Sequence, residues 1–402
     1  MFKSREGKEE TKMIQEHKSG SQKSLLTLVG VGDISPQRDD PPSIFRHCGD
    51  VFRTADFVFG QMEVPISDRG NPNTAVYRRL PPKNVSALTE EGAGFDVMSF
   101  ATNHGMDYGW DAFFDTLDIL KKNNIAVVGA GKNITEARKP TIIEKDGTRV
   151  GFLAYLSVYP TPILIAKEDR PGCAPLRASH YYQESYPTLP TPGTPPLVVT
   201  ELFPEDKKAF DEDIKKLRPQ VDVVVVSMHC GVPLLGSIIA MYQKEAGYAA
   251  IDAGADLILQ HHAHILKGIE MYKGKAIFYG LGNFALEHVL DPSGKVSSIG
   301  SEVHGSLFKQ FNRIKPEPGY EKHRFHHDSL KTMIAKAYIQ DKKIQKVTYI
   351  PAYINPNLEP EVVTRKDPRA QEVFDYVEQI SDSEDLDVRL SWEGDEVLVS
   401  HE

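Results

Sequence analysis

The sequence contains few cysteines and no paired cysteine motif. Its 402 residues include three cysteines, Cys48, Cys173 and Cys230, which lie far apart along the chain. An odd and dispersed set argues against a disulfide framework and favours a reducing compartment. We therefore expect free thiols and a cytoplasmic location.

Long hydrophobic runs are also missing. Residues 1–20 are charged and polar, without the apolar segment of a secretory signal. No stretch approaches the roughly 18 apolar residues that span a bilayer. We expect a flexible tail over residues 1–20 and no transmembrane segment, while the sequence carries no signature of an oligomeric state.

An excess of basic residues is the third absence. The formal net charge is −9 and the sequence pI is about 5.9. Proteins that bind nucleic acid normally present a basic face, so we expect no nucleic-acid partner. An anionic substrate stays compatible with this charge, because a bound divalent cation reverses the local sign.

Short apolar runs alternate with amphipathic segments, which predicts an α/β fold. We expect strands at 24–31, 56–60, 95–101, 125–128, 149–156, 221–227, 256–259, 275–279, 334–340 and 346–350, and helices at 109–123, 204–217 and 240–253. The last two strands are expected to pair with each other.

Two segments interrupt this alternation within a domain expected over residues 21–365. Residues 157–200 hold nine prolines without clear periodicity, and residues 295–333 are polar, so both are interpreted as irregular insertions. Residues 366–402 form a C-terminal extension with one helix and one or two short strands.

Residues of types that bind metals follow five of the predicted strands. They are Asp33, Glu63, Asn103, His229, and His262 with His264. Each alone has an ordinary alternative, since Asp often forms turns and a lone His is usually a core residue. Together they would meet at the carboxyl edge of the sheet, where α/β proteins bind ligands. The sequence therefore predicts a metal site. In an extended segment, His262 and His264 would point to the same side.

The donor set limits the choice of metal. Carboxylates, an amide and imidazoles suit divalent ions such as Mn, Fe, Co or Zn. No thiolate is offered, so a structural zinc site is not expected. Several histidines with two carboxylates allow two ions to share a bridging carboxylate and to activate a water molecule.

The same segments resemble a known family. Gly32-Asp33, FGQMEVP around Glu63, ATNHGMDYGWDAFFDTLDIL, MHCG, GADLILQHHAHILKGIE and YGLGNF occur in family order. They resemble the CapA family of poly-γ-glutamate capsule biosynthesis proteins (the PGA_cap domain), within the calcineurin-like metallophosphoesterase superfamily. The resemblance implies a four-layer α/β/β/α sandwich of the metallophosphoesterase type, holding one or two divalent ions (Mn, Fe or Zn).

The resemblance also implies roles for individual residues. Asp33 takes the place of the carboxylate on the first ion, Glu63 of the bridging carboxylate and Asn103 of the amide ligand on the second ion. His229, His262 and His264 take the places of the imidazole ligands. His104 matches the family's non-ligand acid, which stabilises the transition state.

Two positions depart from the superfamily pattern. Ser35 stands where a histidine usually follows the first aspartate, a gap that CapA-like members share. The run Gln260-His261-His262-Ala263-His264 leaves the register open, and we favour His262 and His264 because this choice keeps the His-x-His spacing. His261 then has a supporting role or contacts the substrate.

Further residues are candidates around this centre. Asp107, with Asn103 and His104 in the expected catalytic set, either orients the His104 ring or caps the helix that begins near Gly109. Arg78 and Arg79 either bind an anionic substrate or form a solvated loop face. A basic group containing His323, Arg324, His326 and His327 is interpreted as a mobile surface loop.

We expect a metal-dependent hydrolase acting on a small-molecule, peptide or polyglutamate substrate. The favoured reaction is cleavage of a γ-glutamyl or related amide bond, linked to poly-γ-glutamate or capsule-type polymer metabolism. The alternatives are hydrolysis of a phosphomonoester or phosphodiester, and a non-catalytic accessory role in polymer synthesis or export.

Overall fold

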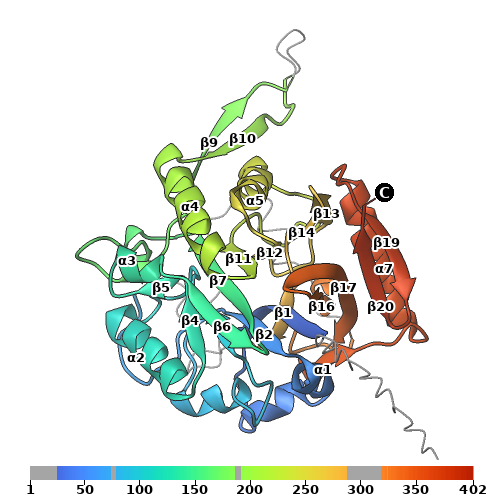
Figure 1. Cartoon of the computed structure of the whole chain (residues 1–402), viewed down its shortest axis with the longest axis horizontal. Coiled ribbons are helices and arrows are strands. Elements are labelled where there is room, and N and C mark those ends of the chain that lie inside the picture. Colours follow the sequence, from blue (N-terminus) through green and yellow to red (C-terminus); the bar gives the residue numbers. More distant parts are fainter. Residues whose placement is uncertain (1–24, 74–77, 186–191, 288–317, 324, 402) are drawn as a thin grey trace, which may run out of the picture.

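Two β-sheets packed face to face form the body of the molecule (Figure 1). The computed structural model describes residues 25–73, 78–185, 192–287, 318–323 and 325–401. The larger sheet has ten strands and the smaller has six among these residues. The expected tail over 1–20 and most of the expected insertion, residues 295–317, lie outside the described residues.

The larger sheet combines a parallel half with an antiparallel half. Its strands are β1 (Leu26–Ser35), β2 (Phe57–Met62), β3 (Val97–Ser99), β4 (Ala126–Val128), β15 (Asn283–Leu286), β16 (Lys331–Gln340), β17 (Lys343–Ile354), β18 (Pro360–Val362), β19 (Arg389–Glu393) and β20 (Glu396–Ser400). The order is β19-β20-β17-β16-β1-β2-β3-β4, with β15 beside β1 and β18 beside β17. β1, β2, β3 and β4 run parallel, and β16 pairs antiparallel with β17 as predicted.

The smaller sheet is parallel at its centre. Its strands are β6 (Thr141–Lys145), β7 (Thr148–Leu156), β11 (Val223–His229), β12 (Leu257–His261), β13 (Ile269–Tyr272) and β14 (Lys275–Phe278), in the order β13-β14-β12-β11-β7-β6. Every residue of β11 is buried. This agrees with its continuous β-branched sequence, which is typical of a strand covered on both faces.

Apolar side chains from the two sheets meet in one core. The rings of Phe59 on β2 and Phe152 on β7 stack with centroids 5.6 Å apart. A Cβ atom at Gly30 would lie 2.7 Å from Leu259 Cδ1, so the sheets approach closely at this point. This packing fixes β1 and β2 against β7 and β12.

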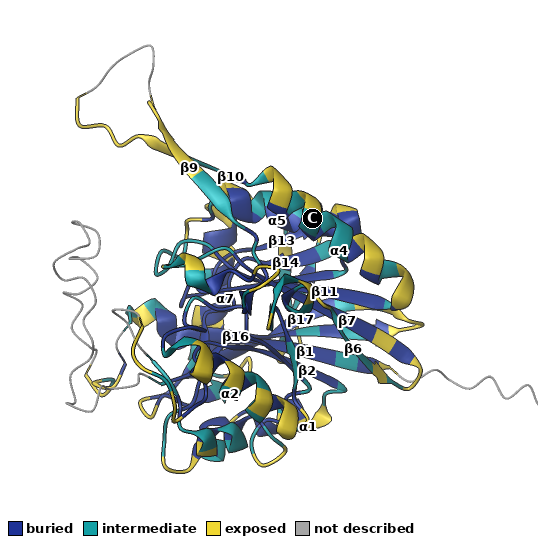
Figure 2. Cartoon of the chain, turned by 90° about the vertical axis from the view of Figure 1, so that its left-hand side faces the viewer, coloured by how far each residue is buried: buried dark blue, intermediate teal, exposed yellow. Residues whose placement is uncertain are grey.

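Helices cover the outer faces of both sheets (Figure 2). The helices are α1 (Gly49–Thr54), α2 (Gly109–Lys122), α3 (Ile134–Ala137), α4 (Pro204–Leu217), α5 (Met241–Ala253) and α7 (Pro368–Asp382). Short 3-10 turns span Pro41–Phe45, Pro82–Ala87, Pro162–Leu164, Arg218–Gln220 and His327–Leu330. Phe113 of α2 packs on Phe100 beside the larger sheet, and Phe210 of α4 packs on Tyr155 of β7. The result is the predicted four-layer α/β/β/α sandwich.

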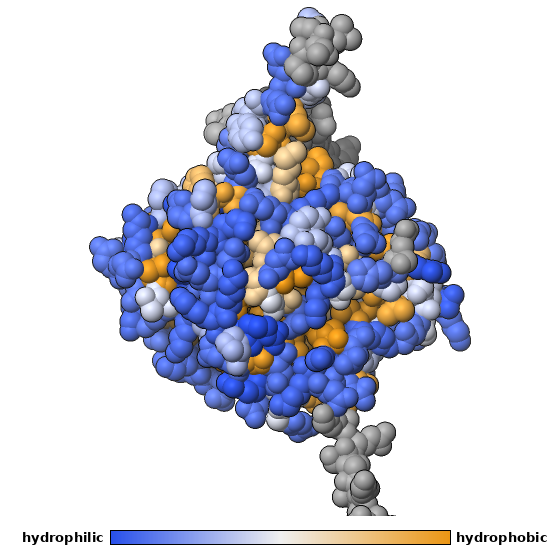
Figure 3. All heavy atoms as spheres, turned by 45° about the horizontal axis from the view of Figure 1, so that its top comes forward, coloured by the Kyte–Doolittle hydropathy of each residue, from blue (hydrophilic) through white to orange (hydrophobic). Residues whose placement is uncertain are grey.

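The segment 157–200 is more regular than its sequence indicated. β8 (Gly172–Cys173) pairs with β5 (Ala130–Gly131), and β9 (Ala178–Gln183) pairs with β10 (Leu197–Leu202) in a hairpin that projects from the body (Figure 1). Exposed hydrophobic residues gather near this hairpin (Figure 3). On the hairpin itself, Tyr182 is 67% and Val198 is 49% exposed. The prediction of an irregular segment is therefore wrong here. The segment holds nine prolines and has no clear periodicity, so its sequence does not indicate that β9 pairs with β10 or that β8 pairs with β5.

The C-terminal segment joins the same body. β20 pairs with β17, and Val377 of α7 belongs to the core that contains the two sheets. In the described part of the chain, none of the helices combines the length and apolarity that crossing a membrane requires.

Candidate metal centre

The predicted ligands converge where the strands of both sheets end. Asp33 lies near the end of β1, Glu63 follows β2, and Asn103 follows β3. His229 ends β11 of the smaller sheet, and His262 and His264 follow β12. The two sheets therefore contribute side chains to one centre, which explains why residues so distant in sequence are neighbours.

The two carboxylates of this centre are buried. Asp33 and Glu63 are 0% exposed, and within the described residues none of their four oxygens has a hydrogen-bond partner. A neighbouring basic group is the His264 ring, whose Nδ1 lies 3.2 Å from Asp33 Oδ2. One ligand atom from each of Asp33, Glu63 and His229 lies within 4.8 Å of the others. Burial, with the charge of Asp33, raises the pKa of Glu63 well above its usual range. Buried carboxylates without donors fit a cation, which would supply the missing charge.

The imidazoles surround these carboxylates. His229 Nε2 lies 2.7 Å from Asn103 Oδ1 and 3.9 Å from Glu63 Oε2. His264 Nε2 lies 3.6 Å from Glu63 Oε1, and the ring centroids of His229 and His262 are 4.9 Å apart. Burial lowers the pKa of His229 well below its usual value and that of His262 to about 3. Both rings are therefore neutral near pH 7, which is the state that binds a metal.

The backbone of the His-x-His segment differs from the expected extended form. β12 ends at His261, and the next residues turn, with φ values of +83° at His262 and +55° at His264. Left-handed conformations are uncommon for residues other than glycine and concentrate at functional sites. The two rings reach the centre through these turns and not through strand alternation.

His261 has a different environment from its two neighbours. It is 1% exposed, and its ring lies 6.2 Å from the ring of Phe59 between the sheets. Among the described residues neither ring nitrogen has a hydrogen-bond partner, and burial lowers the pKa of His261 to about 4. This enclosed position favours the supporting role over a substrate contact.

The segment around Gly282 and Asn283 packs against the residues that carry Asp33 and His264. Asn283 Oδ1 lies 2.9 Å from His264 Nδ1, and the Asp33 amide donates to the carbonyl oxygen of Gly282. A Cβ atom at Gly32 would lie 2.0 Å from that same carbonyl oxygen. Only glycine at position 32 lets the chain bring Asp33 this close to the segment that holds His264.

His104 lies at the edge of the centre in a fixed orientation. Its Nδ1 atom is 2.7 Å from Asp107 Oδ2, and its Nε2 atom is 3.7 Å from Glu63 Oε1. α2 begins at Gly109 without a side-chain cap, so Asp107 contacts the ring and does not cap the helix. The Asp107 carboxylate also accepts a hydrogen bond from the backbone amide of Arg78.

The two candidate arginines have different surroundings. Glu63 and Asp107 act on the charge of Arg78, whose pKa is lowered because burial outweighs their opposing effect. Arg79 lies over the Tyr108 ring, with Cζ 4.1 Å from the ring centroid, and donates to the carbonyl oxygen of Arg69. Arg78 therefore faces the carboxylates, whereas Arg79 covers the loop that follows His104.

One wall of the centre comes from the segment that was interpreted as a surface loop. Phe325 stacks on His264 with ring centroids 5.0 Å apart, and His323 is buried beside Phe325. The interpretation of His323 as part of a surface loop is therefore wrong. In the sequence of this polar segment, Phe325 is the signal that could have indicated packing against the centre.

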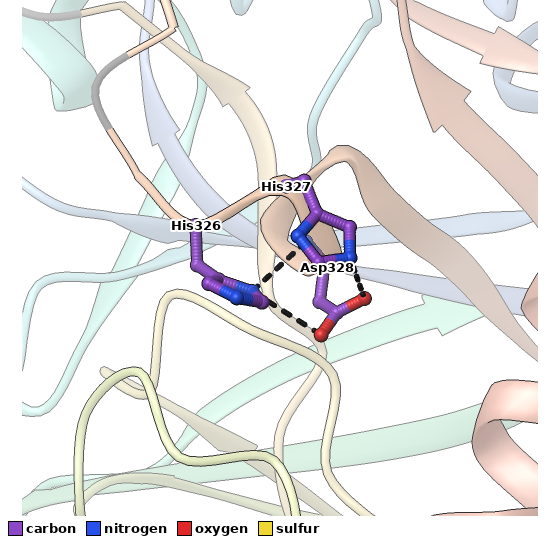
Figure 4. Close-up of side chains that lie close together, drawn as sticks. All are labelled: His326, His327 and Asp328. Carbon is purple, nitrogen blue, oxygen red and sulfur yellow. Dashed lines mark hydrogen bonds and ion pairs between the residues drawn. The ribbon is translucent and has the colours of Figure 1, made fainter. Parts of the chain in front are cut away.

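A second histidine cluster lies just beyond this wall. His326, His327 and Asp328 point toward one another (Figure 4), and all are at least partly exposed. The Asp328 carboxylate already holds the ammonium group of Lys331 at 2.7 Å, and His326 Nδ1 accepts from the backbone amide of Asp328. An ammonium group thus occupies the side of this carboxylate that a metal ion would need.

Buried carboxylates and histidines at the strand ends of an α/β/β/α sandwich define a candidate metal centre in this fold. Residues 17–288 match the bacterial capsule synthesis protein family PGA_cap, and the chain belongs to this family.

The relatives agree with this assignment. The chain is 29% identical over 293 residues to "PGA biosynthesis protein CapA" of Bacillus subtilis, covering 70% of this chain and 67% of that protein. It is 29% identical over 275 residues to "Capsule biosynthesis protein CapA" of Bacillus anthracis, covering 65% of this chain and 60% of that protein.

A more distant likeness is found among solved structures. The calcineurin-like phosphoesterase of Bacillus subtilis aligns with 12% identity and a TM-score of 0.38, covering 89% of this chain and 98% of that one.

Proposed function

We propose that the chain is a metal-dependent hydrolase that cleaves a γ-glutamyl or related amide bond in capsule-type polymer metabolism. The observation that carries this proposal is the pair Asp33 and Glu63, whose buried carboxylate oxygens have only imidazole rings near them and no hydrogen-bond partner among the described residues. An accessory protein without a reaction would have no need for such an energetically costly pair.

The residues that would hold the ions are Asp33, Glu63, Asn103, His229, His262 and His264. A divalent ion in this centre lowers the pKa of a bound water molecule and stabilises the negative charge that develops on the substrate. The donor set suits Mn²⁺, Fe²⁺ or Zn²⁺.

His104 would protonate the leaving nitrogen of the amide. It is held by Asp107 at one ring nitrogen, so the other nitrogen faces the centre beside Glu63. A histidine whose ring is held in this orientation can donate a proton without first rotating its ring. The same arrangement would protonate the leaving oxygen of a phosphoester.

The printed names of the two Bacillus relatives connect the family with PGA and capsule synthesis. Polyglutamate is a chain of amide bonds, and this favours amide hydrolysis over phosphoester hydrolysis as the reaction.

The test uses the full chain, freed of metal and then supplied with Mn²⁺, Fe²⁺ or Zn²⁺. γ-Linked glutamyl oligomers and bis(p-nitrophenyl) phosphate are assayed in parallel for released amine and released nitrophenol. We expect metal-dependent cleavage of the glutamyl oligomer that His229→Ala abolishes. Cleavage of the phosphodiester alone would replace amidase with phosphoesterase, and no cleavage of either would leave an accessory role.

A further inference from the structure

A groove lies beside the loop that carries His104 and Asp107. It has a volume of about 450 Å³ and is lined by the loop Gly70–Asn73, by Tyr108, Trp110 and Asp111 at the start of α2, and by Ile163. This volume falls in the range of about 300–1,000 Å³ that is typical of ligand pockets.

The groove is joined to His104 through one residue. The amide of Asn73 donates to the carbonyl oxygen of Asp107 at 2.7 Å, and the carboxylate of Asp107 holds the His104 ring. Gly70 has a φ of +87°, and a Cβ atom there would lie 2.0 Å from the Tyr108 carbonyl oxygen. The loop that lines the groove therefore packs directly on the segment that carries His104.

The groove and the residues that border it offer three kinds of group that could contact a ligand. The Trp110 side chain is 47% exposed and presents an aromatic face. Asn71 and Asn73 are exposed and carry amide groups, which can both donate and accept hydrogen bonds. Arg79 is not part of the lining but borders it, because its guanidinium group lies over the ring of Tyr108, 4.1 Å from the ring centroid.

The charge of Arg79 is not taken up by a neighbouring carboxylate. Within the residues that the structure describes, its one hydrogen bond goes to a carbonyl oxygen, and it forms no ion pair. Arg69, by contrast, is paired with Asp115 at 2.6 Å and Asp111 at 3.6 Å, so Asp111 does not cancel the charge of Arg79.

We propose that this groove binds the anionic glutamyl chain next to the bond that is cleaved. The asparagine amides would pair with the chain's amide groups, Trp110 would cover its methylene groups, and Arg79 would bind a carboxylate through its forked donors. This inference rests on the proposed function. A neutral polysaccharide would use the same tryptophan and asparagines but would leave the guanidinium group of Arg79 without a counter-ion.

Trp110 allows binding to be measured without turnover. The chain has two tryptophans, and Trp392 stacks on Phe374 of α7, away from the groove. A Trp392→Phe background therefore makes Trp110 the sole tryptophan emitter. Metal-free full-length protein is titrated with a γ-linked glutamyl oligomer, and with a neutral glucan oligomer in parallel.

We expect the glutamyl oligomer to change Trp110 fluorescence at saturating concentration, and Arg79→Gln to weaken its binding by about tenfold. Asn71→Asp adds a negative charge to the groove and should also weaken it, whereas Arg53→Gln on the distant α1 should not. Circular dichroism and thermal unfolding check that each variant is folded. If Arg79→Gln does not fold, Asn71→Asp provides the test of the groove.

Three results would overturn the groove assignment: no fluorescence response, unchanged affinity in the folded groove variants, or a response to the glucan alone. Failure of the proposed function looks different. In that case the glutamyl oligomer binds the metal-free protein with dependence on Arg79, but the metal-loaded protein does not cleave it.

Discussion

The amide oxygen of Asn103 lies 2.7 Å from Nε2 of His229, although 126 residues separate them in the sequence. One residue follows a strand of the larger sheet and the other ends a strand of the smaller sheet. Packing of the two sheets thus creates the centre, and damage to either side should affect the same bound ion.

Replacing His229 should remove metal. His229→Ala deletes a neutral nitrogen donor that faces Asn103 and Glu63, so we expect at least about a tenfold loss of metal affinity. Elemental analysis after reconstitution with Mn²⁺ or Zn²⁺ measures the bound ion. The exposed His180→Ala serves as the matched control, and equal metal content in His229→Ala and wild type would contradict the assignment.

Neutralising Glu63 should stabilise the metal-free protein. Glu63→Gln keeps the shape of the side chain but removes a buried charge that faces Asp33, so unfolding should become less favourable by about 1–2 kcal/mol at pH 8. The same change should reduce the stabilisation that added Mn²⁺ gives.

Urea unfolding with and without the ion measures both effects. Glu144→Gln, on an exposed position of β6, is the control, because its charge does not face the centre. A Glu63→Gln protein less stable than wild type without metal would show that this carboxylate is satisfied by other means.

Removing Asp107 should slow catalysis without releasing metal. Asp107 fixes the His104 ring at 2.7 Å but does not belong to the ligand set. We expect Asp107→Asn to lower kcat by about 10–100-fold and His104→Gln by about 10²–10⁴-fold, with little change in metal content.

The split between kcat and KM separates orientation from simple loss of folding. Asp107→Asn should lower kcat with little change in KM, because only the orientation of the His104 ring is lost. A variant that loses metal together with activity would place Asp107 among the groups that maintain the centre itself.

The buried His323 should make folding sensitive to acid. Burial lowers its pKa from 6.5 to about 4 in the folded chain. Between these pH values the unfolded chain binds a proton that the folded chain excludes, so the free energy of unfolding falls as the pH is lowered. The expected loss is about 1.4 kcal/mol per pH unit for this residue.

Urea unfolding at pH 7.5 and 5.5 tests this expectation. His323→Phe keeps a ring against Phe325 and should lose less stability at pH 5.5 than wild type does. His180→Phe, on the exposed hairpin, is the control and should lose as much stability at pH 5.5 as wild type does. If His323→Phe also loses as much stability as wild type, the acid sensitivity does not come from His323.

The order of elements could be predicted because it depends on local patterns. The β-branched run at 221–227 specifies a strand buried on both faces, and polar residues near the end of β1 and just after β2 and β3 identify the functional edge. The family motifs further specify the four-layer sandwich. Hairpin β9–β10 could not be predicted, because its stability depends on cross-strand pairing that no local period reveals.

The sequence by itself determined which residue types stand at the strand ends and therefore which class of metal they suit. Only the tertiary structure decided where each of them lies. Left-handed turns bring His262 and His264 to the centre, while packing against Phe59 encloses His261. Phe325 stacks on His264 although about sixty residues separate them in the sequence. Arg78 faces the carboxylates of the centre, whereas Arg79 lies over the Tyr108 ring. Such choices depend on which surfaces meet when two sheets pack, and a one-dimensional pattern does not contain that information.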